Sequence, residues 1–191
     1  ALGLLSRFCK MIINQGLGGA LSNFWPSNKT ALGSYDEWLL LHDGPNQHAN
    51  VDDFIDNLDF QPLISILLPT YNSDLNFLTQ AVESVTGQSY SNWQLCIADD
   101  ASTDKDLKDY LKKLETNEKI SIVYRDTNGH ISAATNSALS LAIGEFVTFL
   151  DHDDKLHPHA LSAVVSQLNE DRELDILYSD EDKIDEQGNR S

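Results

Sequence analysis

The chain has 191 residues, enough for one sizeable α/β domain and an accessory segment, because domains typically contain about 100–150 residues. Its 41% hydrophobic and 23% charged residues are typical of a folded globular protein and exclude a disordered chain. The 13 Lys and Arg residues against 30 Asp and Glu give a net charge of −17, which would repel phosphates and excludes DNA or RNA as a partner.

Residues 1–60 are predicted to form an N-terminal helical or irregular appendage, because glycines and prolines interrupt this part of the chain. Apolar residues between Leu2 and Ile12 fall at helical spacing, with Arg7 and Lys10 among them. Such a helix packs on its own domain or on a partner, or it rests on a membrane surface, and both alternatives stay open. No apolar run approaches the roughly 20 residues of a membrane span.

The two cysteines, Cys9 and Cys96, lack CxxC spacing and read as reduced thiols of a cytoplasmic protein. Peripheral association with a membrane surface is the second alternative for the location.

Residues 61–191 are predicted to form a second part, in which short apolar runs alternate with amphipathic stretches. The runs, read as buried strands, are 63–68, 94–98, 120–124, 146–150 and 175–178. The stretches, read as helices, are 74–86, 104–116, 131–143 and 158–169. This alternation predicts a mostly parallel sheet with helices on both faces, whose ligands bind at the carboxyl ends of the strands.

The first strand is followed by Pro69, Thr70, Tyr71 and Asn72. Proline ends the ladder, and the next three residues offer a hydroxyl, an aromatic face and an amide, which suit a flat base. An ordinary strand-to-helix turn also favours these residue types, so a purely structural role stays open.

The second strand is followed by two adjacent acids, Asp99 and Asp100, and then by the helix-capping sequence Ser102, Thr103 and Asp104. Asp99 is the first residue past a buried strand and is harder to explain as a cap. A carboxylate there can accept the imide N–H of a uracil or thymine ring, which would select the base.

The fourth strand is followed by Asp151, His152, Asp153 and Asp154. Carboxylates this close repel one another unless a cation neutralises them, and hard divalent cations prefer oxygen ligands. A divalent metal site is therefore predicted at Asp151 and Asp153, with a solvated turn as the alternative.

Two further groups are weaker candidates. The acidic residues 180–182 follow the fifth apolar run and either face a substrate or form a solvated turn. His130, His152, His157 and His159 lack the HExxH spacing of a zinc site, which argues against zinc.

Four ordered segments, PTYN (69–72), ADDASTD (98–104), NGHISAATN (128–136) and GEFVTFLDHDD (144–154), resemble family 2 glycosyltransferases of the GT-A fold. The resemblance covers about residues 62–187. The ending YSDEDKID (178–185) is similar to that of bacterial transferases that build O-antigens and other surface polysaccharides.

The resemblance implies a metal-dependent, inverting transfer of a sugar from a UDP- or dTDP-sugar to a saccharide or lipid-linked saccharide acceptor. It implies that Thr70 and Tyr71 contact the base and that Asp99 takes its ring N–H. It also implies that Asp151 and Asp153 form the DxD pair for Mn²⁺ or Mg²⁺, with Asp153 as the principal ligand. The expected nucleotide-sugar site comprises Pro69, Thr70, Tyr71, Asn72, Asp99, Asp100, Asp151 and His152.

The chain departs from the family pattern in two places. Many relatives carry an arginine where this chain has Thr135, so a cationic contact with the nucleotide is missing and neutralisation of the phosphates would depend more on the metal. The general base of such enzymes is expected beyond Ser191.

Two rival functions remain open. One is a non-catalytic nucleotide-sugar-binding module. The other is a metal-dependent phosphohydrolase that uses Asp151 and Asp153, although Lys155 stands where such enzymes place Thr or Val.

Overall fold

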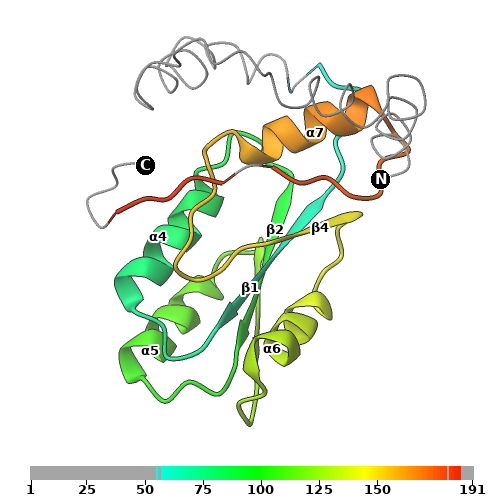
Figure 1. The fold of residues 1–191 in the computed structure, drawn as a ribbon. Helices are drawn as coiled ribbons and strands as arrows, with labels where there is room; N and C mark the ends of the chain where they lie inside the picture. The colour runs from blue at the N-terminus through cyan, green and yellow to red at the C-terminus, as the bar shows by residue number, and fades with distance from the viewer. Residues whose placement is uncertain (1–54, 56, 180, 186–191) are drawn as a thin grey trace, which may run out of the picture. The chain divides into compact units, whose positions relative to one another are not determined.

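The structure is a computed structural model that describes residues 55, 57–179 and 181–185 (Figure 1). Residues 51–169 form one compact unit, and residues 1–50 with 170–191 form another. The helix expected between Leu2 and Ile12 lies outside the described residues.

A parallel sheet of four strands organises the larger unit (Figure 1). The strands are β1 (Ile64–Thr70), β2 (Trp93–Asp99), β3 (Ile120–Tyr124) and β4 (Phe146–Phe149). Their order is β3-β2-β1-β4, and every neighbouring pair is parallel. The predicted parallel sheet and the positions of its first four strands are therefore confirmed. The prediction that all four are buried is wrong for β4, because Val147 and Phe149 are exposed.

Four helices follow the strands in turn, as the sequence predicts. They are α4 (Leu75–Thr86), α5 (Lys105–Leu114), α6 (His130–Leu139) and α7 (Ala160–Glu170). Among the described residues, none of the helices is both long enough and apolar enough to cross a membrane.

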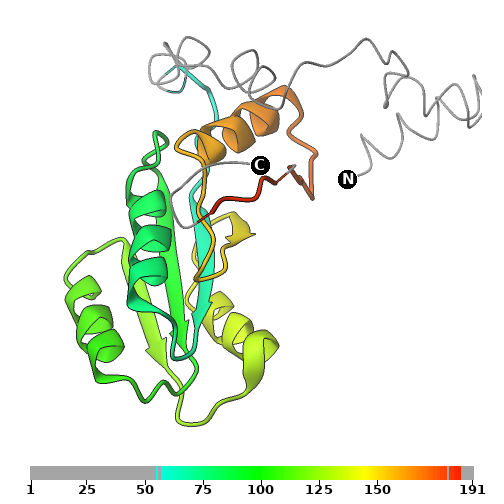
Figure 2. The ribbon, with the colours of Figure 1, turned by 60° about the vertical axis from the view of Figure 1, so that its left-hand side comes forward.

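Both faces of the sheet are covered because side chains of a strand alternate between the two faces. Ile64, Ile66 and Leu68 of β1 face the larger core, which α4, α5 and α7 share. Leu67 faces the other way and packs in a smaller cluster with Ala134 of α6. Figure 2 shows α4 and α6 on opposite sides of the sheet, which confirms the prediction of helices on both faces.

Aspartate caps fix the starts of the first two helices. An oxygen of Asp74 accepts hydrogen bonds from the N–H groups of Asn76, at 2.8 Å, and Phe77, at 3.3 Å. Asp104 accepts one from the N–H of Leu107 at 2.9 Å, as the capping sequence predicts. The loops after β1 and β2 thus end at defined points.

The fifth predicted strand, residues 175–178, is wrong. These residues belong to the other unit and form no strand. Tyr178 is 81% exposed, and Ile176 is exposed as well. An apolar run becomes a strand only where its backbone groups pair with a neighbouring strand, and residues 175–178 take part in no such ladder.

Candidate functional site

A cavity of about 510 Å³ lies at the carboxyl edge of the sheet. Segments that follow each of the four strands line it. Parallel strands bring their carboxyl ends to one edge, which is why segments far apart in the sequence meet there. Of the residues predicted for the site, Pro69, Thr70, Tyr71, Asp100, Asp151, His152 and Asp153 line this cavity.

The end of β1 and the residue after it contribute a fixed hydroxyl and an accessible ring. The expectation that Pro69 ends the ladder is wrong, because β1 continues through Pro69 to Thr70 and stays paired with β2. Thr70 is buried, and its Oγ1 shares a hydrogen bond of 2.7 Å with the hydroxyl of Ser73. Tyr71 is 48% exposed, so its ring is accessible to a ligand in the cavity. The aromatic face that the sequence predicts is therefore present at this edge.

Asn72 does not line the cavity but joins two loops. Its backbone N–H donates to the Oγ of Ser102 at 2.8 Å, and its Oδ1 accepts from the N–H groups of Thr103, at 2.8 Å, and Asp104, at 3.3 Å. These bonds connect the loop after β1 to the start of α5. The contact between Asn72 and a nucleotide remains a prediction.

The two adjacent acids at the end of β2 have different surroundings. Asp99, expected to be the first residue past the strand, is instead its last residue. Asp99 is 1% exposed, and its Oδ1 accepts a hydrogen bond from the N–H of Ser102 at 3.2 Å. Asp100, the next residue, lines the cavity, whereas Asp99 does not. The base contact predicted for Asp99 remains a prediction.

Asp100 is held by a cation and a backbone N–H. Its Oδ1 accepts a hydrogen bond from the Nε of Arg125 at 2.6 Å, and both of its oxygens lie 3.0 Å from the N of Gly129. Asp100 is 2% exposed, and a carboxylate that is so buried needs such charge-assisted partners.

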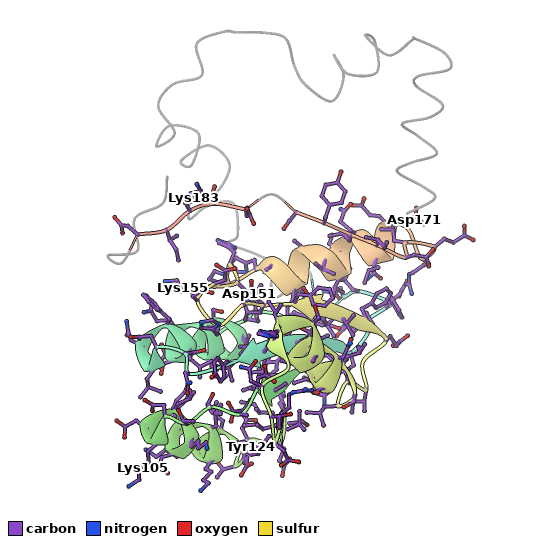
Figure 3. All side chains as sticks on the ribbon, turned by 60° about the horizontal axis from the view of Figure 1, so that its bottom comes forward. Lys105, Tyr124, Asp151, Lys155, Asp171 and Lys183 are labelled. Carbon is purple, nitrogen blue, oxygen red and sulfur yellow. The ribbon has the colours of Figure 1, made fainter. Side chains whose placement is uncertain are left out.

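The segment after β4 brings carboxylates to the cavity. Asp151 and Asp153 are exposed and His152 is half-buried, and all three line the cavity. The N–H of Asp154 donates to the carbonyl of Asp151 at 3.2 Å, which closes a turn. Figure 3 labels Asp151 and Lys155 on this segment, which joins β4 to α7.

This pair of carboxylates fits a cation that a ligand helps to hold. Within the described part of the chain, no cluster of three or more His, Cys, Asp or Glu side chains could bind a metal alone. Mg²⁺ and similar ions are commonly held by one or two carboxylates together with substrate phosphates and water. Asp151 and Asp153, exposed on the wall of a cavity, match that donor set.

Residues after β3 also line the cavity and were missed as site residues: Asn128, His130, Ile131 and Ala134. Arg125, the partner of Asp100, was missed as well. The signal was available, because a segment that follows a parallel strand reaches the same edge as the others.

Left-handed backbone marks the same edge. The non-glycine residues with positive φ in the described chain are Asn72 (45°), Ala101 (65°) and His130 (63°). Each lies in the segment after a different strand, β1, β2 or β3. Such conformations are costly for residues with a Cβ, and they cluster at functional sites.

Comparison with known proteins agrees with the geometry. The model of the family described as glycosyl transferase family 2 matches residues 65–190. The uncharacterized protein y4gI of Sinorhizobium fredii is 43% identical over 143 residues, which is 74% of this chain and 16% of that protein. The O-antigen biosynthesis protein RfbC of Myxococcus xanthus is 33% identical over 167 residues, 87% of this chain and 13% of that protein.

Among solved structures, that of TarS residues 1–349 from S. aureus in complex with UDP-GlcNAc has a TM-score of 0.52 and 29% sequence identity. The match covers 57% of this chain and 32% of TarS 1–349, and it confirms the expected GT-A fold. The chain thus spans a minor part of the length of these relatives. Because the family model matches well over half of its residues, the chain belongs to glycosyl transferase family 2.

Proposed function

We propose that the cavity binds the nucleotide diphosphate of a sugar donor and that the protein transfers the sugar to a saccharide or lipid-linked saccharide in bacterial polysaccharide synthesis. The observation that carries this proposal is the presence of Tyr71, Asp100, Asp151 and Asp153 on the wall of one cavity. Family membership supports it, as do the O-antigen relative and the structure of TarS with UDP-GlcNAc.

The nucleoside binds between an aromatic ring and an acceptor. The exposed face of Tyr71 stacks on the base. A carboxylate has about four acceptor positions, so the Oδ2 of Asp100 keeps capacity for one more N–H beside that of Gly129. We assign the base N–H to Asp100 rather than Asp99, because Asp100 is the acid on the cavity wall. An acceptor at this place favours uracil or thymine, hence a UDP- or dTDP-sugar.

The diphosphate binds through a divalent cation, Mn²⁺ or Mg²⁺, held by Asp151 and Asp153. Without a cation these carboxylates would repel the phosphates. When bound, the metal supplies charge stabilisation for the departing nucleotide diphosphate. The protein's own contribution is to present two oxygen ligands on one turn, closed by the hydrogen bond from Asp154 to Asp151.

The transfer itself needs a general base and an acceptor site. In the proposed reaction the acceptor hydroxyl gives its proton to that base and attacks the anomeric carbon. The bond between this carbon and the diphosphate breaks from the opposite side, so the configuration is inverted.

The two rivals use the same residues differently. A binding module would hold the donor without transfer. A phosphohydrolase would use Asp151 and Asp153 as nucleophile and acid, with Thr or Val at the position of Lys155. Lys155 instead donates to Gln80 of α4 at 3.3 Å and does not line the cavity.

Isothermal titration of UDP and dTDP, with Mn²⁺ or with EDTA, tests the donor site. We expect EDTA and Asp153→Asn each to weaken binding at least about tenfold, a change of roughly 1.4 kcal/mol. Asp154→Asn is the matched control, since Asp154 does not line the cavity, and it should bind as the unchanged chain does. Equal affinity in EDTA would refute the metal-dependent site.

An assay of sugar transfer from UDP- and dTDP-sugars to added saccharides separates an enzyme from a module. Release of nucleotide diphosphate that depends on an added saccharide supports transfer. Release of phosphate from simple esters supports hydrolysis instead.

A further inference from the structure

One arginine connects two walls of the cavity. The Nε of Arg125 donates to Asp100, and its Nη1 donates to the carbonyl of Ala133 at 3.0 Å and to the Oγ of Ser137 at 2.6 Å. Ala133 and Ser137 belong to α6, the helix whose first turns line the cavity. Arg125 therefore ties the Asp100 wall to the α6 wall.

Gly129 leaves room for the guanidinium of Arg125. A Cβ on Gly129 would lie 2.5 Å from the Nη2 of Arg125 and 2.8 Å from the Cβ of Ala133. Gly129 leaves the space through which the guanidinium reaches α6, and its N–H donates to Asp100 as well. The left-handed residue His130 follows directly.

The two ends of the guanidinium have separate tasks. The Nε end forms an ion pair with Asp100 and fixes the direction of its carboxylate. Nη1 fixes the guanidinium against α6, where two acceptors hold it in one plane. A lysine could supply the positive charge, but its compact ammonium group could not reach both Asp100 and the acceptors on α6 as the planar guanidinium does.

We propose that Arg125 is a positioning residue of the nucleotide site, which holds the Asp100 carboxylate in the orientation that accepts a hydrogen bond from a base with an N–H to donate. The inference rests on the proposed function, because it requires that Asp100 meets the base. Arg125 acts through Asp100 and does not itself touch the nucleotide.

The test compares Arg125→Lys and Arg125→Met with the unchanged chain, using UDP with Mn²⁺ and inorganic pyrophosphate with Mn²⁺ as probes. Pyrophosphate shares the metal and phosphate contacts of UDP but lacks the base. We expect Arg125→Lys to weaken UDP binding about tenfold and to leave pyrophosphate binding within about twofold, since only the base contact depends on Asp100. The control is Arg172→Lys, the same exchange at an exposed arginine that is not among the residues lining the cavity.

A double-mutant cycle with Asp100→Asn shows whether the arginine acts through that carboxylate. In the Asp100→Asn background, Arg125→Lys should cause little further loss of UDP affinity. Thermal unfolding of each variant shows that it is folded, and Arg125→Lys keeps the test decisive should Arg125→Met not fold.

The possible outcomes separate this inference from the proposed function. The positioning role is overturned if Arg125→Lys lowers the affinity for UDP and for pyrophosphate equally. It is also overturned if the losses of UDP affinity in the double-mutant cycle are additive. UDP binding that Arg125→Lys leaves unchanged overturns the inference alone and leaves the proposed function standing. No binding of UDP by the unchanged chain overturns the proposed function and this inference with it.

Discussion

The side-chain oxygen of Asn72 accepts a hydrogen bond of 2.8 Å from the backbone N–H of Thr103, which joins the loop after β1 to the loop after β2. Asn72 adopts a positive φ of 45° to make this contact, a conformation that asparagine tolerates better than most residues. The same oxygen also accepts from the N–H of Asp104, the cap of α5. One amide thus fixes the spacing of two loops that border the cavity.

Replacing Asn72 by alanine should therefore destabilise the fold. Asn72→Ala leaves the N–H groups of Thr103 and Asp104 without this acceptor, and we expect a loss of about 1–3 kcal/mol in the free energy of unfolding. Urea unfolding measures it, with Asn76→Ala in α4 as the control. Equal stability of the two variants would contradict the linking role.

Ala101→Gly should stabilise the chain. Ala101 has a φ of 65°, which costs a residue with a Cβ roughly 1–2 kcal/mol, more than the roughly 0.5–1 kcal/mol of backbone entropy that glycine adds. We expect a gain of up to about 1 kcal/mol, seen as a higher melting temperature. Ala163→Gly, in the exposed helical interior of α7, should instead lower it.

Gly144 permits a close contact between the segment after α6 and the start of β1. A Cβ at this position would lie 2.5 Å from the carbonyl of Leu63 and 2.8 Å from the N of Ser65. Gly144→Ala must therefore push backbone apart, and we expect a loss of about 1–3 kcal/mol. At Gly87 the nearest atom to a Cβ, the carbonyl oxygen of Glu83, is 3.1 Å away, so Gly87→Ala should lower the free energy of unfolding by less. Differential scanning calorimetry of the two variants measures the difference, and an equal loss for both would contradict the close contact at Gly144.

Alkaline pH should weaken the fold through Cys96. Burial raises the pKa of its thiol from 9.0 to about 11, so the folded state disfavours the thiolate. The stabilisation is fully present below pH 9 and is lost as the pH rises toward 11, because the unfolded chain releases its proton first.

Urea midpoints at pH 8, 9 and 10 measure this effect, and Cys96→Ala should show a shallower decline. The remaining slope belongs to groups such as Tyr90, Tyr110 and Tyr124, whose pKa values burial also raises. Identical slopes for the two proteins would show that the thiol does not contribute.

Most of the fold could be predicted because strands read as short apolar runs, whether they are buried on both faces, as β1 and β2 are, or partly exposed, as β4 is. The four strands of the sheet and the four helices lie where the spacing of apolar residues indicates. Residues 175–178 show the limit of this reasoning, since a local pattern carries no information about a partner strand.

The site was predictable at the level of loops but less so at the level of side chains. Neighbouring residues at a strand end point in different directions, so the sequence alone does not tell which of Asp99 and Asp100 reaches the cavity. The role of Arg125 depends on a long side chain that crosses to a helix, which no spacing rule predicts. The segment after β3, however, reaches the cavity edge as the segments after the other strands do, which the parallel order of the strands makes predictable.

A crystal structure of the chain with UDP and Mn²⁺ tests the central claim most directly, because it locates the base, the diphosphate and the cation at once. We predict the uracil between Tyr71 and Asp100, and Mn²⁺ bound by Asp153 and the diphosphate. UDP bound outside this cavity, or Mn²⁺ bound away from both Asp151 and Asp153, would contradict the account.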